Sequence, residues 1–310
     1  MSNKDLFDLQ RQHRKQTADV RHSLLLPMNR DTFQIQLDHA PDVSQQCREA
    51  LDEFLPNGSP SRRMLISFRD LQEVQSAYEV RQRGVPVPEL GDDARIYPHF
   101  GVFWPARSDY RYLVKTAPLP HPGPRVAVDI GTGTGCLALI LAQRGIEHVV
   151  ATDIDIRAVA CARDNIQRFG YSDRIQVHQS DLFPAEDLDQ RASLIVFNPP
   201  WIPGNAASTV ERAVFDTKDS DVLKAFLREA PRRLDDGGVI WLLISDFAEL
   251  LGLRKPGELE TYFEAAGLRV LDRLEAPASH PKALNKSSKT DLLLRLRKQE
   301  KVSLWRLVVR

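Results

Sequence analysis

The stretch Asn198-Pro199-Pro200-Trp201 combines residues that could hold a planar amino group. Two successive prolines remove two backbone N–H donors and fix φ, so the carbonyls near Asn198 and Pro199 stay free to accept hydrogen bonds. The Asn198 side-chain oxygen adds another acceptor, and Trp201 offers a flat aromatic face. This set suits methylation of an amide or exocyclic amine, because the delocalised lone pair of such a nitrogen must be turned toward an electrophile. The simpler interpretation is a proline-rich loop after a strand.

Three alternating glycines form a second candidate site. Gly131, Gly133 and Gly135 follow the apolar run Val126–Ile130, which contains Asp129, and an apolar helical pattern comes after them. Glycines permit a sharp turn and let a ligand lie against bare backbone. The helix N-terminus after the glycines offers unpaired N–H groups to a polar or anionic ligand. A plain tight turn between strand and helix is the alternative interpretation.

Two further acids end the next two strand patterns. Asp153 lies about 20 residues beyond the glycines, where nucleotide-binding α/β units place an acid that accepts hydrogen bonds from ribose hydroxyls. Asp181, in Ser180-Asp-Leu-Phe183, could reach the edge of an adenine or simply cap a turn. Cys136 stands where the nicotinamide-type motif G-x-G-x-x-G needs its third glycine. The cysteine at this position disfavours a dinucleotide site, which stays an alternative interpretation.

Alternating strand and helix patterns from Pro124 onward predict a parallel sheet covered on both faces. Ligands in such sheets lie at the carboxyl ends of the strands, near the point where strand order reverses. All four candidate segments fall at such ends. The predicted strands are Val126–Ile130, Val149–Asp153, Ile175–Gln179, Leu194–Asn198 and Val239–Ile244, with helices beginning near Gly135, Ile156, Ser220 and Gly257.

The residues before this sheet predict a smaller helical domain. Helical patterns with breaks run from about residue 4 to 83, and residues 84–98 are rich in Pro and Gly. We therefore expect a helical N-terminal domain at 1–96 that selects the substrate, a hairpin linker at 97–123 and the main domain at 124–310. The aromatic residues of the linker could pack between the domains, form a wall of the cofactor site, or do both.

Composition narrows the class of protein. The 310 residues are 42% hydrophobic and 27% charged, and 42 basic residues balance 42 acidic ones, so no overall charge favours a nucleic-acid partner. Cys47, Cys136 and Cys161 lie far apart, which indicates reduced thiols and no zinc site. No apolar run approaches membrane length. We expect a cytoplasmic monomer that binds no metal and no membrane.

A basic segment precedes the last predicted strand. Between residues 282 and 301 seven basic residues face two acids, an excess of 7 − 2 = 5. This segment interrupts the predicted final hairpin between Leu268–Leu274 and Val302–Val309, either as a solvated insertion with a short helix or as a contact for RNA, DNA or a ribosome-linked factor. The charged residues are Lys282, Lys286, Lys289, Arg295, Arg297, Lys298 and Lys301, against Asp291 and Glu300.

The series DIGTGTG, ATDID, QSDLF and NPPW resembles the class I S-adenosylmethionine-dependent methyltransferases. It is most similar to the HemK/PrmC-like group, whose members methylate a glutamine side-chain amide in peptide release factors. The resemblance is good from Val126 to Ile202 and weaker beyond. It implies an α/β fold with a Rossmann-like sheet of seven strands, the last hairpin antiparallel, and a smaller helical N-terminal domain joined by a hairpin linker.

The resemblance also assigns roles, with S-adenosyl-L-methionine as the cofactor. The glycines would hold its methionine part, Asp153 its ribose and Asp181 its adenine, while Asn198 and Pro199 would hold the acceptor amine. The implied cofactor-binding residues are Asp129, Gly131, Thr132, Gly133, Gly135, Asp153, Ile154, Asp181, Leu182 and Asn198, and the implied catalytic residues are Asn198, Pro199, Pro200 and Trp201.

Three departures from the family concern the substrate. Trp201 replaces the Tyr of the NPPY motif, the linker motif PRPDTE is kept only in part, with Arg107 and Asp109 as its candidates, and the N-terminal region shows little likeness. The acceptor could therefore be a release-factor-like protein, the exocyclic amine of adenine in RNA or DNA, or a small molecule. A nicotinamide-dependent oxidoreductase and a non-catalytic binding module are the hypotheses from other classes.

Overall fold

The computed structural model divides the chain into two compact units. One comprises residues 1–84 and 97–101, and the other comprises residues 85–96 and 102–310. The structure describes residues 2–51, 63–121, 123, 125–184, 191–206, 213–217, 219–277, 279 and 292–310.

The first unit is helical with one pair of antiparallel strands. Its long first helix is capped by Ser2, whose side chain accepts from the Asp5 N–H. Its last helix is capped by Ser67, whose side chain accepts from the Asp70 N–H, and Leu65 lies in the strand before this helix. The elements are α1 (Asn3–Ser23), β1 (Leu25–Asn29), α2 (Ser44–Leu51), β2 (Arg63–Ser67) and α3 (Phe68–Arg83), and β1 pairs with β2.

A mixed sheet forms the second unit, in the order β12-β13-β11-β8-β5-β6-β7. β13 runs antiparallel to both of its neighbours, and the other pairs are parallel. The seven-stranded sheet with an antiparallel last hairpin is thus confirmed. Its strands are β5 (Val126–Ile130), β6 (His148–Asp153), β7 (Ile175–Gln179), β8 (Ala192–Phe197), β11 (Leu234–Ser245), β12 (Leu268–Pro277) and β13 (Lys301–Val309).

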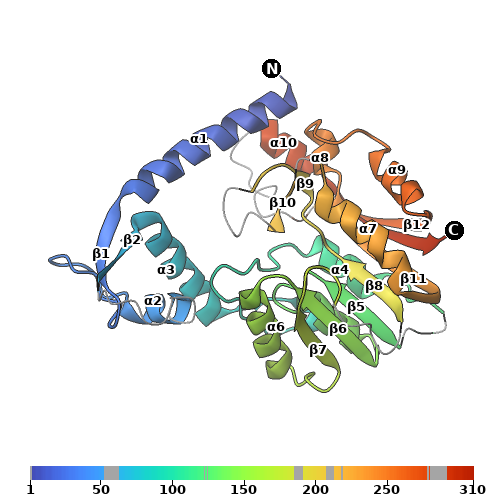
Figure 1. Ribbon diagram of the computed structural model, residues 1–310, viewed down its shortest axis with the longest axis horizontal. Coiled ribbons are helices and arrows are strands. Elements are labelled where there is room, and N and C mark those ends of the chain that lie inside the picture. Colours follow the sequence, from blue (N-terminus) through green and yellow to red (C-terminus); the bar gives the residue numbers. More distant parts are fainter. Residues whose placement is uncertain are drawn as a thin grey trace. The chain divides into compact units, whose positions relative to one another are not determined.

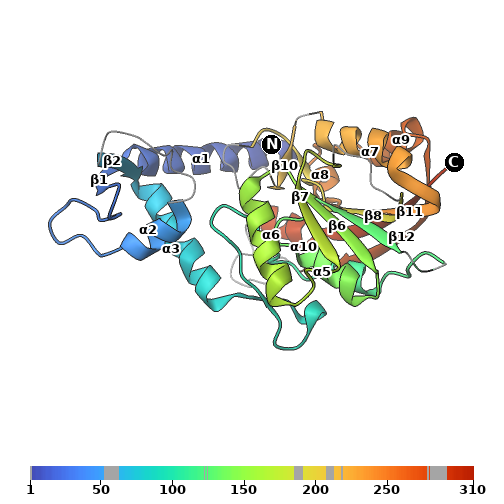
Figure 2. The ribbon, with the colours of Figure 1, turned by 60° about the horizontal axis from the view of Figure 1, so that its bottom comes forward.

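Helices cover both faces of this sheet, and each face has its own apolar cluster (Figures 1 and 2). One cluster joins the sheet to α4 (Asp109–Thr116), α5 (Cys136–Gln143) and α6 (Ile156–Arg168). The other joins it to α7 (Asp221–Arg233) and α9 (Glu258–Ala265). In Figure 2, α7 and α9 lie above the sheet and α5 lies below it. The central strands β5 and β8 are therefore buried on both faces, which explains their nearly continuous apolar sequences, whereas β7 and β12 toward the edges keep exposed residues.

The hairpin predicted at 97–123 is wrong for the described part of that range. Residues 97–108 contain no strand, and Asp109–Thr116 is helix α4. A short antiparallel pair occurs earlier instead, between β3 (Val85–Pro86) and β4 (Arg95–Ile96). Val85 and Ile96 are both buried and lie on either side of the turn that contains the 3₁₀ helix η2 (Pro88–Leu90).

Short elements complete the second unit. β9 (Ile202–Pro203) pairs in parallel with β10 (Phe215–Asp216), α8 (Phe247–Leu250) comes after β11, and α10 (Leu292–Gln299) precedes β13. Most of the predicted basic segment lies outside the described residues, which resume at 292 with α10. Among the helices that the structure describes, none has the length and apolar character needed to span a membrane. Within the same residues, no group of three or more His, Cys, Asp or Glu side chains is arranged to hold a metal.

Candidate functional site

The carboxyl ends of β5, β6 and β8 meet at one edge of the sheet. Ile130 is paired with Thr152 on one side and with Phe197 on the other. The next residues along these three strands, Gly131, Asp153 and Asn198, therefore lie beside one another. β5 has neighbours on both sides that come later in the chain, so this edge is the point where strand order reverses. The structure brings the predicted glycine loop, second acid and Asn-Pro-Pro-Trp segment together there.

The three glycines of the loop all adopt left-handed backbone conformations, but the atoms that surround them differ. Their φ angles are 64° at Gly131, 55° at Gly133 and 79° at Gly135. A Cβ on Gly131 or Gly133 would meet its nearest atom only at 3.6 Å, whereas on Gly135 it would lie 3.3 Å from three atoms of Ala162 in α6. Gly135 is also buried. The first two glycines thus leave room for a ligand, and the third also allows close packing of the loop against α6.

Gly135→Ala should lower the free energy of unfolding by more than the matched change Gly170→Ala. Both glycines are left-handed, with φ of 79° and 72°, but a Cβ at Gly170 would meet nothing within 4 Å. A left-handed Ala costs about 1–2 kcal/mol in either place, and crowding against Ala162 adds about 1 kcal/mol or more at Gly135. Chemical denaturation of the two variants measures the difference. Equal losses would mean that the contact with α6 does not restrict this position.

Asp129 is a buried acid near the end of β5, and only one of its two carboxylate oxygens is hydrogen-bonded among the described residues. Its Oδ2 accepts from the Thr132 hydroxyl at 2.7 Å and from the Ala138 N–H at 3.1 Å. Its Oδ1 is buried and has no hydrogen-bond partner among the described residues. Burial, opposed by those two hydrogen bonds, raises the pKa of Asp129 to about 7. A cationic ligand group near Oδ1 would offset this cost.

Asp153 holds the glycine loop in place. Its Oδ2 accepts from the Gly133 N–H at 2.9 Å, 20 residues earlier in the chain, and its Oδ1 accepts from the Asp155 N–H at 3.0 Å. Burial raises its pKa above the ordinary value, although these backbone N–H groups favour the ionised form. Ile154, the next residue, is 65% exposed. The carboxylate therefore faces the loop, and an exposed apolar side chain lies beside it.

The Asp181 segment continues from the end of β7. The Ser180 N–H donates to the Asp153 carbonyl at 2.9 Å, which extends the pairing of β6 and β7 by one residue. Leu182 has a φ of 63°, unusual for a residue with a Cβ, and its carbonyl accepts from the buried Thr152 hydroxyl at 2.5 Å. Asp181 itself is exposed next to this fixed turn. Its side chain and the neighbouring backbone are thus free to meet a ligand at the same edge as Asp153.

Asn198 and Trp201 are hydrogen-bonded to each other. The Trp201 indole Nε1–H donates to Asn198 Oδ1 at 2.9 Å and to the Leu243 carbonyl at 3.1 Å. Asn198 Oδ1 therefore already accepts one hydrogen bond, and its second lone pair can accept another. One indole N–H is shared between two acceptors, Asn198 Oδ1 and the Leu243 carbonyl.

The Trp201 ring is also less open than predicted. The Arg107 guanidinium carbon lies 4.7 Å from the ring centroid, and Tyr110 meets the ring edge to face at 6.3 Å. Arg254, which is buried, donates to the Trp201 carbonyl at 3.4 Å. One face of the indole is thus covered by an arginine.

Sequence patterns missed three contributors to this region. Glu300 and Ser245 are buried and belong to the ion cluster around Arg107. Glu300 stands in the basic segment, where it counted only as one acid among cations. The Phe103 carbonyl lies 3.6 Å from the Cβ position of Gly133, so the chain before α4 passes over the glycine loop. The aromatic run around Phe103 gave a signal for such a wall, but no pattern indicated which atom would face the loop.

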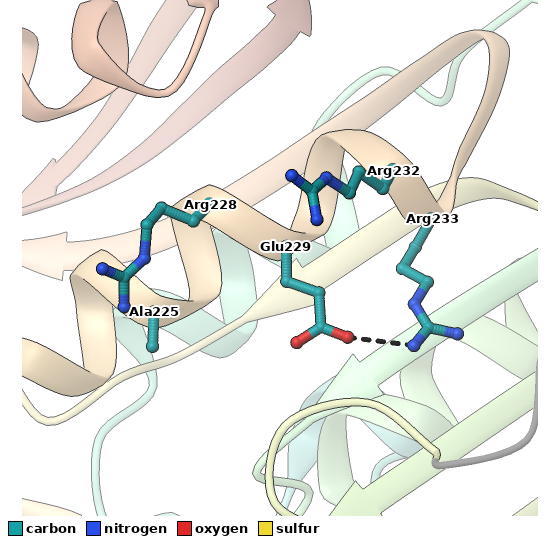
Figure 3. A pocket seen from close by; sticks show the side chains of 5 residues that line it. All are labelled: Ala225, Arg228, Glu229, Arg232 and Arg233. Carbon is teal, nitrogen blue, oxygen red and sulfur yellow. Dashed lines mark hydrogen bonds and ion pairs between the residues drawn. The ribbon is translucent and has the colours of Figure 1, made fainter.

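An open pocket of about 520 Å³ lies elsewhere, on the outer surface of α7 (Figure 3). It is lined by Ala225, Arg228, Glu229, Arg232 and Arg233, and a 3.0 Å ion pair joins Glu229 to Arg233. All five residues come from one helix. None of the glycine-loop or Asn198 residues lines this pocket, so we assign it no part in the site.

The known proteins that this chain resembles are methyltransferases. The model of the Methyltransferase small domain family matches residues 93–266, more than half of the chain. A release factor glutamine methyltransferase of Cereibacter sphaeroides is 34% identical over 152 residues, which cover 46% of this chain and 51% of that protein. A tRNA1(Val) (adenine(37)-N6)-methyltransferase of Trichodesmium erythraeum is 36% identical over 145 residues, which cover 42% of this chain and 60% of that protein. The chain thus spans about half the length of the curated relatives it matches.

Among solved structures, a ribosomal protein L11 methylase of Lactobacillus delbrueckii subsp. bulgaricus is similar with a TM-score of 0.46 and 17% identity. The match covers 71% of this chain and 87% of that one.

Proposed function

Because the chain belongs to the Methyltransferase small domain family, a family of S-adenosylmethionine-dependent enzymes, we propose that it transfers a methyl group to a planar nitrogen held beside Asn198. The observation that carries this proposal is the meeting of Gly131, Asp153 and Asn198 at one sheet edge. Two of these residues belong to the predicted donor site and one to the acceptor site, and transfer requires both sites to be adjacent.

The described residues fit S-adenosylmethionine. Gly131 and Gly133 leave bare backbone, and the buried Asp129 Oδ1 lacks a partner that the ammonium of the methionine part could supply. Asp153 would accept from the ribose, and Asp181, Ile154 and Leu182 would meet the adenine. When bound, the cofactor supplies a methyl group on a sulfonium centre, and the neutral thioether is a good leaving group. The protein then mainly aligns donor and acceptor, which can lower a barrier by about 7–11 kcal/mol.

The acceptor amine would donate to the second lone pair of Asn198 Oδ1, beside the indole N–H. Its N–H groups would donate to Asn198 Oδ1 and to the Pro199 carbonyl, while Trp201 keeps its bond to Leu243. These hydrogen bonds strengthen as the nitrogen becomes cationic during transfer, so they stabilise the transition state more than the bound substrate. No strong base is required, since the methylated cation loses its proton readily.

For the acceptor we propose a glutamine side-chain amide in a release-factor-like protein. Support comes from the Asn-Pro-Pro-Trp segment and from the relative named as a release factor glutamine methyltransferase. An adenine exocyclic amine in RNA is the second candidate, favoured by the relative named as a tRNA adenine methyltransferase. We further propose that residues 1–96 select the substrate and that the enzyme works as a cytoplasmic monomer.

Affinity for S-adenosylhomocysteine should fall about tenfold between pH 8 and pH 6. The pKa of Asp129 is about 7 before binding. An ammonium beside Oδ1 needs the ionised carboxylate, so the protonated form must lose its proton before it binds, and the apparent affinity drops as the pH falls below 7. Calorimetric titration across this range measures the effect. Asp129→Asn should flatten the profile and Asp173→Asn, on an exposed turn, should not. If the affinity of Asp129→Asn still fell between pH 8 and pH 6, another group would be responsible for the pH dependence.

The proposed function is tested by calorimetric binding of S-adenosylmethionine and S-adenosylhomocysteine. Transfer of labelled methyl into a cell extract, fractionated into protein, RNA and small molecules, then identifies the acceptor class. Label in protein supports the glutamine amide, and label in RNA supports the adenine amine. Absence of binding by either compound would overturn the assignment as a methyltransferase.

A further inference from the structure

Arg107 lies in a buried cluster of charged side chains that links distant parts of the chain. Its Nε donates to Asp109 Oδ2 at 2.9 Å, and its Nη1 donates to Glu300 Oε1 at 2.9 Å, across 193 residues of sequence. The exposed fractions are 7% for Arg107, 4% for Asp109 and 1% for Glu300. Two carboxylates on one guanidinium hold its plane by several directed bonds, which a single surface ion pair cannot do.

Both carboxylates are themselves fixed. Glu300 Oε1 also accepts from the buried Ser245 hydroxyl at 2.5 Å, and Glu300 Oε2 pairs with Arg297 at 3.0 Å. Asp109 accepts from the Ser279 N–H at 2.7 Å. Burial alone would lower the pKa of Arg107, but Glu300 and Asp109 outweigh it and keep this pKa above its ordinary value. The guanidinium is therefore a permanent cation with a fixed orientation.

This cation lies against Trp201. The guanidinium carbon is 4.7 Å from the indole centroid, inside the range of a cation–π contact, and Tyr110 restricts the ring from its edge. The same indole carries the N–H that bonds to Asn198 Oδ1 at 2.9 Å. A continuous chain of contacts thus runs from Glu300 through Arg107 and Trp201 to Asn198.

We propose that Arg107 is a positioning residue for methyl transfer. Held by Asp109 and Glu300, it fixes the plane of Trp201, and Trp201 in turn fixes the side-chain amide of Asn198 so that Oδ1 points toward the acceptor. This inference rests on the proposed function, because Asn198 is the acceptor-binding group there. Lysine cannot replace Arg107, since an ammonium does not stack on the ring while binding two carboxylates.

The structural part of the proposal is tested without a substrate, by the indole N–H resonances of ¹⁵N-labelled protein. The signal of Trp201 is identified by its absence in Trp201→Phe. In Arg107→Met this signal should shift and its hydrogen exchange should speed up by about tenfold. Arg273→Met is the matched control, because it removes a guanidinium 4.3 Å from the Trp305 ring and should move the Trp305 signal only. An unchanged Trp201 signal in folded Arg107→Met would overturn the proposal.

The catalytic part uses labelled-methyl transfer to the extract. Arg107→Met should lower kcat about tenfold, with affinity for S-adenosylhomocysteine within about twofold of wild type. In a Trp201→Phe background, Arg107→Met should lower kcat by less than about twofold, because Arg107 acts through the indole ring of Trp201. Equal losses in both backgrounds would contradict the inference. If the wild type neither binds cofactor nor transfers methyl, the proposed function fails, while the resonance experiment still decides the role of Arg107 in holding Trp201.

A second variant guards against misfolding. Arg107→Met leaves two buried carboxylates without their cation, which can unfold the unit. Combining it with Asp109→Asn and Glu300→Gln removes those charges and should restore the unfolding temperature. The Trp201 signal should remain displaced in this triple variant, because no cation covers the ring. A wild-type signal in the folded triple variant would overturn the proposal, and Arg107→Lys should recover less than half of the lost kcat.

Discussion

Asn198→Ala should reduce methyl transfer by on the order of 10²–10³-fold in kcat while leaving cofactor affinity nearly intact. The side-chain oxygen of Asn198 is the only acceptor in the Asn-Pro-Pro-Trp segment that a substitution can delete without altering the backbone. Its loss removes a hydrogen bond that strengthens as the acceptor nitrogen becomes cationic. Single-turnover transfer from S-adenosylmethionine measures the rate, and calorimetry measures the affinity.

Trp201→Phe provides the comparison for Asn198→Ala. It also breaks the bond between the indole and Asn198 Oδ1, but it keeps the acceptor oxygen. Its kcat should therefore lie well above that of Asn198→Ala. If Asn198→Ala lost cofactor binding with its fold preserved, Asn198 would belong to the donor site and not to the acceptor site.

Asp153→Ala should show the opposite pattern, with cofactor affinity weakened by on the order of 100-fold, about 3 kcal/mol. Two effects add at this position. The carboxylate would accept from the ribose, and in the structure it also holds the Gly133 N–H at 2.9 Å. Its loss therefore removes a ligand contact and loosens the loop that the ligand must meet. Calorimetric titration with S-adenosylhomocysteine measures the change.

Asp173→Ala is the control for that measurement, because it makes the same change of charge on an exposed turn of the same unit. It should leave affinity within about twofold. Unchanged affinity in Asp153→Ala would remove Asp153 from the cofactor site. A loss of kcat at saturating cofactor, without a loss of affinity, would instead assign Asp153 to the transfer step.

Sequence reasoning succeeded where short local patterns determine the structure. Val126–Ile130 and Ile175–Gln179 are strands with the bounds that were predicted, because each is a short run of β-favouring residues ended by a turn. The three site segments meet because parallel strands place their carboxyl ends at one edge. The antiparallel final hairpin was predicted from the family resemblance and from two apolar runs near the end of the chain.

Long-range side-chain contacts could not be predicted in this way. The bond between Trp201 and Asn198 spans only three residues, yet the same indole also contacts Leu243 and Arg107, which lie far from it in the sequence. The closeness of Gly135 to Ala162 of the next helix could not be predicted from the motif, which suggested only a ligand contact. Pairing of Val85 with Ile96 was missed because strands of two residues carry no periodicity.

The place of β13 in the sheet has a consequence for folding. β13 comes after β11 and β12 in the chain, yet it lies between them and pairs with both. Until β13 is synthesised, β11 has an unpaired edge of buried apolar residues, and such edges promote aggregation. Glu300 stands immediately before β13, so Arg107 gains its second carboxylate only when this strand inserts. The ion cluster that holds Arg107 beside Trp201 therefore cannot be complete before the last strand is in place.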